Sequence, residues 1–477
     1  MNKSIRLTAL FCILLTTILL VNQTIIQAFS EEKYAQNPKN MREFLQMQSI
    51  ARGQIFAGGT VLAESDQNED ETYSRFYPTN SPAFGPVTGY LSQSFGASQV
   101  EASYNDVLNG TADSLFSQNW LDVLTGRQPD GANVEVTIDP ALQQFAYDQL
   151  NDNGYQGAAV AIEPSTGRIK AMSSTPSFDP NGIANPETAE ETWAALQEQD
   201  GNPLLNHATQ ETLPPGSIFK IITAAAGLNN GYSPSSDVTG LNSITLPNTQ
   251  TELTNYDNQL CNGSQRVTLE TAFANSCNTA FVEMGIDVGP EQLRHYADAF
   301  GVGQNYDLGV GTSPGNLGDI ADDAALGQSS IGQRDVTMSA LQAAIMGATV
   351  ANSGTRMEPF MVERLTDSEM NEIRTTKPRE AEQAVNSDVA TTLTNLMYAS
   401  EKQTAGYDGN SFASKTGTAE HGEGLAPHVW YVAFDPAKDL AVAVVVKNGG
   451  NLGNTATGGK VSAPIGRAIL NNYGGGQ

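Results

Sequence analysis

The segment PPGSIFKIITAAAGL, from Pro214 to Leu228, carries the most informative local pattern in the chain. Two prolines and a glycine stand directly before Ser217, and Lys220 follows three residues later, ahead of an apolar run with helical spacing. A helix that begins just after Gly216 would place Ser217 in its first turn, where free backbone N–H groups and the helix dipole favour a developing negative charge. Ser217 and Lys220 would then share one face of the helix. Taken alone, Ser217 would be interpreted as a helix cap.

A second segment, SKTGTAEHG from Ser414 to Gly422, supplies a cation that could act on Lys220. A lysine ammonium cannot accept a proton, so Lys220 can serve as a base only if burial or another positive group lowers its pKa. Lys415 is the candidate for that group. The segment also holds a small residue for close backbone approach and two hydroxyls for a substrate carboxylate, namely Gly417, Thr416 and Thr418.

A third segment, NSCNTAF, lies in a stretch with helical spacing from Leu269 to Met284. Ser276 offers a hydroxyl that could relay protons, and Asn278 offers an amide that could hold a peptide carbonyl. The patterns S-x-x-K and S-x-N also occur elsewhere in the chain, but K-[ST]-G occurs once. The order of the three segments, and their contexts of helix start, helix and strand edge, therefore carry the prediction of a serine acyl-transfer site.

Together, S-x-x-K, S-x-N and K-T-G resemble the motifs of the class B penicillin-binding proteins, and most closely those of an actinobacterial subgroup. Three further segments share the resemblance: RGQI at Arg52, GAAVAIEPSTGRIKAMSSTPSFDPN from Gly157, and WYVAF from Trp430. The resemblance covers nearly everything after the N-terminal apolar segment. It implies an α/β transpeptidase fold like that of the serine β-lactamases, with an antiparallel sheet between helices and a smaller N-terminal module.

The resemblance also implies a role for each motif residue. Ser217 would be the acylated nucleophile and Lys220 its base, while Ser276 would pass a proton to the leaving group. Asn278 would bind the substrate backbone, and Lys415 would keep Lys220 neutral. The backbone N–H groups of Ser217 and Thr418 would form an oxyanion hole. The implied substrates are peptidoglycan stem peptides and β-lactam antibiotics, with no cofactor.

The chain is long enough for two or three compact units. Residues 30–153 are polar with short apolar runs and predict an irregular, strand-containing module. Residues 154–477 begin with a predicted hairpin from Gly157 to Ser174 and contain another from His428 to Asn448, with helical patterns between them. Strands at both ends with helices between predict one antiparallel sheet closed by distant segments.

The N-terminus carries an uncharged stretch of 23 residues, Leu7 to Phe29, after a predicted cytoplasmic tail of residues 1–6. This length is enough to cross a bilayer as a helix. Lys3 and Arg6 precede the stretch and two glutamates follow it, so the catalytic part is expected outside the cytoplasm. No A-x-A-like cleavage site is present, which favours a retained anchor, with a cleaved signal peptide as the alternative.

Cys261 and Cys277 are the only cysteines after the apolar segment, since the third, Cys12, lies inside it. An oxidising compartment permits a disulfide between them. Two free buried thiols are the alternative. If the bond forms, it ties the segment around Ser276 to the preceding loop and could fix how Ser276 is presented.

Composition excludes several other functions. Acidic residues outnumber basic ones 52 to 25, a net charge of −27, which would repel nucleic acid. A zinc site from His421 and His428 would lack an evident third ligand, so no metal is expected.

Two alternative functions remain open. One is a β-lactamase, although the chain has no E-x-x-L-N loop, and the other is a penicillin-sensing or scaffold protein. Cell-wall or division proteins are the expected partners, through the N-terminal module and the anchor.

Overall fold

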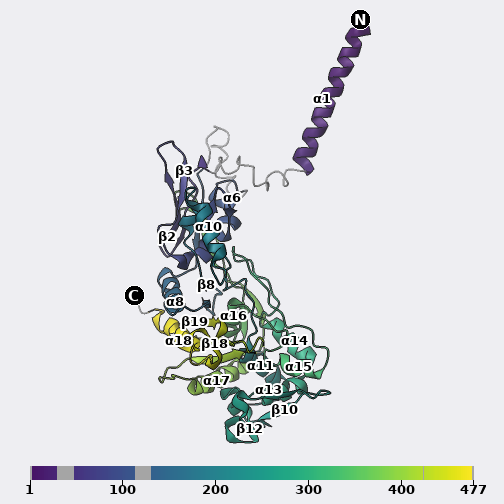
Figure 1. Ribbon diagram of the computed structural model, residues 1–477, viewed down its shortest axis with the longest axis vertical. Helices are drawn as coiled ribbons and strands as arrows, with labels where there is room; N and C mark the ends of the chain where they lie inside the picture. Colours follow the sequence, from purple (N-terminus) through teal and green to yellow (C-terminus); the bar gives the residue numbers. More distant parts are fainter. Residues whose placement is uncertain (1–2, 30–47, 113–129, 423, 475–477) are drawn as a thin grey trace.

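The computed structural model describes residues 3–29, 48–112, 130–422 and 424–474. Figure 1 shows a long N-terminal helix, an upper module and a larger lower module, with the C-terminus beside the larger one. Residues 30–47 and 113–129 of the predicted N-terminal module, and residues 1–2 of the predicted tail, lie outside the described residues. The helix α1, Lys3–Phe29, includes a candidate membrane span from Ile5 to Ile25 with a mean hydropathy of 2.1 and no buried residue.

The larger module is built on a five-stranded antiparallel sheet in the order β17-β18-β19-β7-β8. β7 and β8 form one predicted hairpin, β18 and β19 form the other, and β19 pairs with β7 to close the sheet. The predicted fold class is therefore confirmed. The strands are β7 (Gly157–Ile162), β8 (Ile169–Thr175), β17 (Ala413–Ala419), β18 (His428–Asp435) and β19 (Leu440–Val446).

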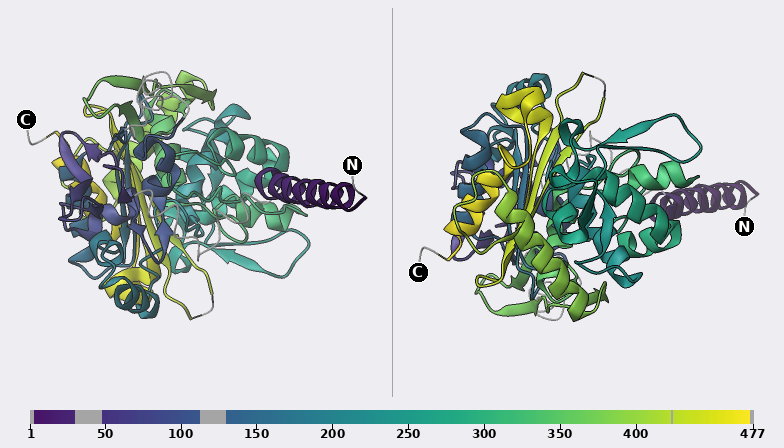
Figure 2. Two further views of the ribbon diagram at one scale, coloured as in Figure 1. Left: turned by 90° about the horizontal axis from the view of Figure 1, so that it is seen from above. Right: turned by 90° about the horizontal axis from the view of Figure 1, so that it is seen from below.

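Both faces of this sheet are covered, which explains why β18 and β19 are buried throughout and read as nearly continuous apolar runs. Successive residues of a strand point to opposite faces, so Tyr431 belongs to one core and Trp430 to the other. Figure 2 shows α8 and α18 on one side of the sheet and the teal helices on the other. The covering helices are α8 (Pro140–Asn151) and α18 (Ser462–Asn472) on the first face, and α11 (Lys220–Asn229) and α16 (Ala340–Ala351) on the second.

A helical region beside the second face contributes to the same core as α11. It replaces the predicted helix Leu269–Met284 with two shorter helices separated by a turn, discussed below. Its helices are α12 (Leu269–Ala274), α13 (Asn278–Val288), α14 (Pro290–Ala299), α15 (Asp323–Ser329) and α17 (Ser387–Gln403). Short strands complete it: β9 (Asp237–Thr239), β10 (Ser243–Thr245), β11 (Glu252–Thr254) and β12 (Arg266–Thr268).

The upper module contains a six-stranded sheet in the order β15-β14-β6-β1-β2-β3. Two of its strands come from residues 362–375, which lie beyond the sequence boundary expected at residues 153 and 154. The strands are β1 (Ile55–Ala57), β2 (Thr60–Gln67), β3 (Tyr73–Phe76), β6 (Asn133–Val136), β14 (Val362–Thr366) and β15 (Glu372–Thr375). Two more short strands, β13 (Thr355–Met357) and β16 (Glu380–Gln383), pair with each other. They flank β14 and β15 in the sequence.

A buried ion cluster holds the upper module together. Glu101 accepts hydrogen bonds from Arg52 Nε at 2.8 Å and from Arg75 Nε at 2.5 Å, and all three side chains are almost fully buried. Arg52 of the RGQI segment is therefore a structural residue of this module. Its short elements include β4 (Leu91–Ser92), β5 (Gly96–Ala97), α4 (Gly85–Thr88), α5 (Gln99–Ser103) and α6 (Asn105–Leu108), with α9 (Pro180–Ala184) and α10 (Ala189–Glu198) packed beside it (Figure 1).

Candidate active site

Ser217 lies in a 3-10 turn, Gly216–Phe219, that leads directly into α11. The turn starts at Gly216, whose φ of +55° is a conformation that favours glycine. A Cβ at Gly216 would approach the Thr418 carbonyl oxygen to 2.8 Å, so only glycine lets the turn lie this close to β17. Ser217 is therefore presented beside the C-terminal end of β17, at the start of a helix.

Ser276 lies in the turn between α12 and α13. Its φ is +57°, a left-handed conformation that is rare for serine and interrupts the helix predicted from Leu269 to Met284. The Cys277 N–H donates to Ala272 O at 2.9 Å and closes the turn. The turn presents both the hydroxyl and the carbonyl of Ser276 to the two lysines. Strained backbone of this kind is often found at functional sites.

Two buried lysines meet at Ser276. Lys220 Nζ donates to Ser276 O and to Asn278 Oδ1, each at 2.7 Å, and lies 3.4 Å from Ser276 Oγ. Lys415 Nζ donates to Ser276 Oγ at 2.8 Å and to Thr416 O at 3.2 Å. The Ser276 hydroxyl thus connects the two amines, and a proton could pass along this path.

Burial is the main cause of the unusual electrostatics here. It lowers the pKa of Lys220 well below its ordinary value, and the nearby Lys415 lowers that pKa further. Burial also lowers the pKa of Lys415 to about 7. The sequence pointed to Lys415 as the group that keeps Lys220 neutral, whereas in the structure desolvation of Lys220 itself is the larger effect.

Asn278 holds Lys220 in place as well as facing the cleft. Its Oδ1 accepts from Lys220, and its Nδ2 donates to Thr254 O of β11 at 2.8 Å. The second hydrogen of Nδ2 remains for a ligand carbonyl.

The motif residues surround a cleft of about 670 Å³. Ser217, Ser276, Asn278, Thr416 and Thr418 line it, while both lysines lie beneath its floor with no exposed surface. Gly417 permits the close packing of β17 on the turn before α11, since a Cβ there would lie 2.7 Å from Pro215 O. In the part of the chain that the structure describes, no hydrogen bond joins Ser217 Oγ to Lys220 Nζ.

Sequence reasoning missed Glu401, a buried carboxylate of α17 behind the site. Glu401 accepts hydrogen bonds from Tyr431 of β18 at 2.9 Å and from Arg467 of α18 at 2.7 Å, and from the hydroxyl of Ser414. Ser414 directly precedes Lys415, so this network fixes the strand that carries Lys415. A glutamate in an amphipathic helix gives no signal in the sequence that distinguishes it from a surface residue.

A disulfide joins Cys261 to Cys277, next to Ser276, and closes a loop of 16 residues. A bond across such a loop typically stabilises a fold by roughly 3 kcal/mol, chiefly through the lost entropy of the unfolded chain. Cys261→Ala should therefore lower the free energy of unfolding by about this amount and slow the acylation of Ser217, because the turn at Ser276 loses its covalent tie.

Chemical denaturation and the rate of labelling by a fluorescent penicillin would measure both effects. Cys12→Ser is the matched control, since Cys12 is a free cysteine in α1. Unchanged stability and an unchanged labelling rate in Cys261→Ala would refute a role for the disulfide.

The two histidines considered above as zinc ligands lie against each other near the cleft. The rings of His421 and His428 stack at 3.9 Å, and His421 Nε2 lies 2.8 Å from Ala426 O. Within residues 3–29, 48–112, 130–422 and 424–474, no group of three or more potential ligands could hold a metal ion.

Two family models match the chain. The penicillin binding protein transpeptidase domain matches residues 157–471, and the penicillin binding protein A dimerisation domain matches residues 52–134. The first match spans the five-stranded sheet and every motif residue of the cleft. The second spans most of the described part of the upper module.

Similar proteins agree with these matches. Peptidoglycan D,D-transpeptidase PbpA of Mycolicibacterium smegmatis is 43% identical, and that of Mycobacterium tuberculosis is 42% identical, each alignment covering 98% of both chains. The penicillin G acyl-enzyme complex of penicillin-binding protein A from M. tuberculosis superimposes with a TM-score of 0.84 at 42% identity, covering 89% of this chain and 99% of the other. The ceftriaxone acyl-enzyme complex gives a TM-score of 0.85 at 41% identity, covering 90% and 99%. By its sequence and its fold, the chain belongs to the penicillin-binding protein transpeptidase family.

Proposed function

We propose that this protein is a membrane-anchored D,D-transpeptidase that cross-links peptidoglycan stem peptides through an acyl-enzyme on Ser217. The single observation that carries the proposal is the junction at Ser276, where two fully buried lysines meet one hydroxyl beneath the cleft that Ser217 lines. An amine held neutral by burial can act as a general base. The names of the relatives at 42–43% identity support the same activity.

Acylation follows from the positions of these groups. Lys220 removes the proton of the Ser217 hydroxyl, whose oxygen attacks the carbonyl carbon of the penultimate D-alanine. The N–H groups of Ser217 and Thr418 stabilise the oxyanion, a role supported by the close approach of Gly216 to the Thr418 backbone. Ser276, linked to both lysines, then protonates the departing amine, and D-alanine leaves.

The second half-reaction uses the same groups in reverse. An amine of another stem peptide attacks the ester carbon, its proton passes through Ser276 and Lys220 to the Ser217 oxygen, and an amide replaces the ester. During the acylation step, the Thr416 and Thr418 hydroxyls bind the terminal carboxylate of the donor, which then departs with D-alanine. A β-lactam acylates the same serine, but the nitrogen released when its ring opens stays attached to the acyl group, so no amine departs to make room for an acceptor.

The test is direct. Full-length protein in detergent should form a stable one-to-one adduct with a fluorescent penicillin, and mass spectrometry should locate the label on the peptide that contains Ser217. A label at another residue, or no label, would disprove the proposal. Rapid turnover to hydrolysed drug would instead favour a β-lactamase.

The pH dependence of acylation tests the roles of the lysines. Because Lys220 must be neutral to accept a proton, the rate should rise with pH through the pKa of Lys220. Lys415 lowers that pKa, so Lys415→Met should move this rise to higher pH and reduce the rate at neutral pH by about tenfold or more. Penicillin acylation rates measured from pH 6 to pH 10 would detect the shift.

Lys415→Arg is the control, because arginine keeps the positive charge while changing the shape of the side chain. If both variants move the pH profile equally, the effect of Lys415 on Lys220 is not electrostatic.

The localisation and domain division extend the proposal. We infer that α1 crosses the membrane with residues 1–6 in the cytoplasm and the cleft outside, supported by Lys3 and Arg6 before the span. Protease added outside intact cells tests this orientation.

We propose that residues 30–153 form the N-terminal module and residues 154–477 the transpeptidase domain. Strands β14 and β15 of the second range complete the sheet of the module.

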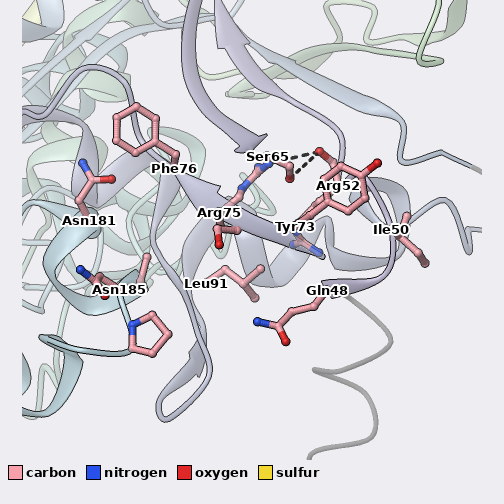
Figure 3. Close-up of a pocket in the computed structure, with 13 residues that line it drawn as sticks. Gln48, Ile50, Arg52, Ser65, Tyr73, Arg75, Phe76, Leu91, Asn181 and Asn185 are labelled. Carbon is pink, nitrogen blue, oxygen red and sulfur yellow. Dashed lines mark hydrogen bonds between the residues drawn. The ribbon is translucent and has the colours of Figure 1, made fainter. Parts of the chain in front are cut away.

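Cell-wall or division proteins are the proposed partners of the N-terminal module and α1. In support, the module contains a cavity of about 270 Å³ whose lining includes Arg52, Arg75 and Asn185 (Figure 3). Phe76, which also lines it, is 37% exposed. Site-specific crosslinking from position 185 in cells would identify a bound partner.

A further inference from the structure

A second groove lies beside the cleft at the turn that carries Ser276. It has a volume of about 800 Å³ and lies between α12, α17 and the chain that leads into β17; we call it the flanking groove. Asn275, the residue before Ser276, lines both the cleft and the flanking groove. Ser411 and Phe412, which precede β17, line its other side. The flanking groove and the cleft therefore share Asn275, in the turn that carries Ser276.

The lining of the flanking groove is suited to a peptide. Asn395, Tyr398 and Gln403 of α17 line it, and in the described part of the chain their side chains make no hydrogen bond to protein. Free amide and phenol groups can pair with the N–H and C=O groups of a peptide backbone. Lys402 is the one cation among the described lining residues and can pair with a carboxylate.

The chemistry of the second half-reaction assigns an occupant to this groove. Attack of an amine on the acyl-enzyme is the reverse of the step in which an amine leaves, so the incoming nitrogen must occupy the place of the departing one. That place is beside the Ser276 hydroxyl, which handles the proton in both directions. The acceptor must therefore extend from Ser276 away from the acyl group on Ser217, and the flanking groove begins at Asn275, the neighbour of Ser276.

The distances along the chain agree with this direction. The leaving D-alanine carries the carboxylate that Thr416 binds, and four or five residues of extended chain separate Thr416 from Phe412 and Ser411. At about 3.3 Å per residue this path is about 15 Å long, which matches a peptide of four or five residues.

We propose that the flanking groove binds the acceptor stem peptide during cross-linking, an inference that rests on the proposed transpeptidase function. The acceptor amine attacks the ester carbon, the bond to Ser217 Oγ breaks, an amide bond forms, and the proton of the amine returns to Ser217 Oγ. Lys402 pairs with a carboxylate of the acceptor, while Asn395 and Gln403 bind its backbone.

The experiment separates the acceptor step from acylation. Full-length protein is acylated with a synthetic N-acyl-D-alanyl thioester, and the products of aminolysis and hydrolysis are measured with L-Ala-γ-D-Glu-L-Lys-D-Ala as the acceptor. Asn395→Trp fills the groove from an exposed position and should lower the ratio of aminolysis to hydrolysis by about tenfold. Ser387→Trp is the matched control, because it is exposed on the same helix about 12 Å away at 1.5 Å per residue. Lys402→Glu should reduce the ratio, with exposed Lys377→Glu as its control.

Four measurements on Asn395→Trp make the outcome decisive. Penicillin acylation and thioester hydrolysis should be unchanged in Asn395→Trp, because the donor does not use the groove. Aminolysis by free D-alanine, which is too short to reach it, should also be unchanged. Titration calorimetry with the tetrapeptide and Ser217→Ala protein should show binding that Asn395→Trp weakens by about tenfold.

Normal acylation with an unchanged aminolysis ratio in Asn395→Trp would overturn the acceptor groove and leave the transpeptidase function intact. Absence of acylation in the unsubstituted protein would overturn the transpeptidase function. In that case the calorimetry alone decides whether the groove binds the peptide.

Discussion

Replacing Lys220 with methionine should slow the acylation of Ser217 by penicillin by about 10² to 10⁴-fold, the contribution expected from a positioned general base. Methionine is long and apolar enough to occupy the buried site of Lys220, so the fold should persist. The loss should not recover at high pH, because the variant has no group at this position that could accept the proton. This contrasts with Lys415→Met, in which Lys220 remains and alkaline pH restores part of the rate.

Stopped-flow measurement with a fluorescent penicillin would give the acylation rate constant, and thermal unfolding would verify that Lys220→Met is folded. Lys377→Met is a suitable control, since Lys377 is exposed and far from the cleft. If Lys220→Met acylates within about threefold of the unsubstituted rate, another group must be the base.

Glu401→Gln should be the most destabilising of the proposed substitutions. The change leaves Arg467 buried without a carboxylate, and removing one partner of a buried ion pair typically costs 3–5 kcal/mol. The Tyr431 and Ser414 hydroxyls also lose a charged acceptor. The melting temperature should fall by roughly 5–15 °C. Since Ser414 precedes Lys415, penicillin acylation should slow even in the fraction that remains folded.

Thermal and chemical denaturation would measure the loss, with Glu198→Gln at an exposed position of α10 as the control. The double variant Glu401→Leu/Arg467→Met removes both charges and should recover much of the stability, because the cost lies in the unpaired guanidinium. A loss below about 1 kcal/mol in Glu401→Gln would show that water or another group compensates Arg467.

The sequence predicts the fold well where local pattern and tertiary structure agree. The apolar runs from Val429 and Leu440 indicate buried strands, and the structure contains β18 and β19 there. Both hairpins of the five-stranded sheet lie where they were expected. The start of α11 after Gly216 also follows from a local pattern, because proline and glycine limit the backbone in ways that neighbouring residues cannot overrule.

Other features depend on distant contacts and give no local signal. The spacing of apolar residues from Leu269 to Met284 is continuous, yet the helix breaks at Ser276, where the structure has hydrogen bonds from Lys220 and Lys415 and the disulfide of Cys277. The pairing of β14 with β6 joins residues more than 200 positions apart. The sequence likewise indicates that Lys220 needs a lowered pKa, but its burial, which is the larger cause, depends on how α11, α13 and β17 pack together.

Because β14 pairs with β6 of the N-terminal sheet, that sheet cannot be completed until much of the chain has been synthesised. β6 ends at residue 136 and its neighbour β14 begins 226 positions later, at residue 362. At about 5–20 residues per second, one edge of β6 waits about 11 to 45 s for its partner. An unpaired strand edge is prone to pair with other chains. The upper module is therefore the part of this protein that most needs protection while the chain is made, although its sequence begins first.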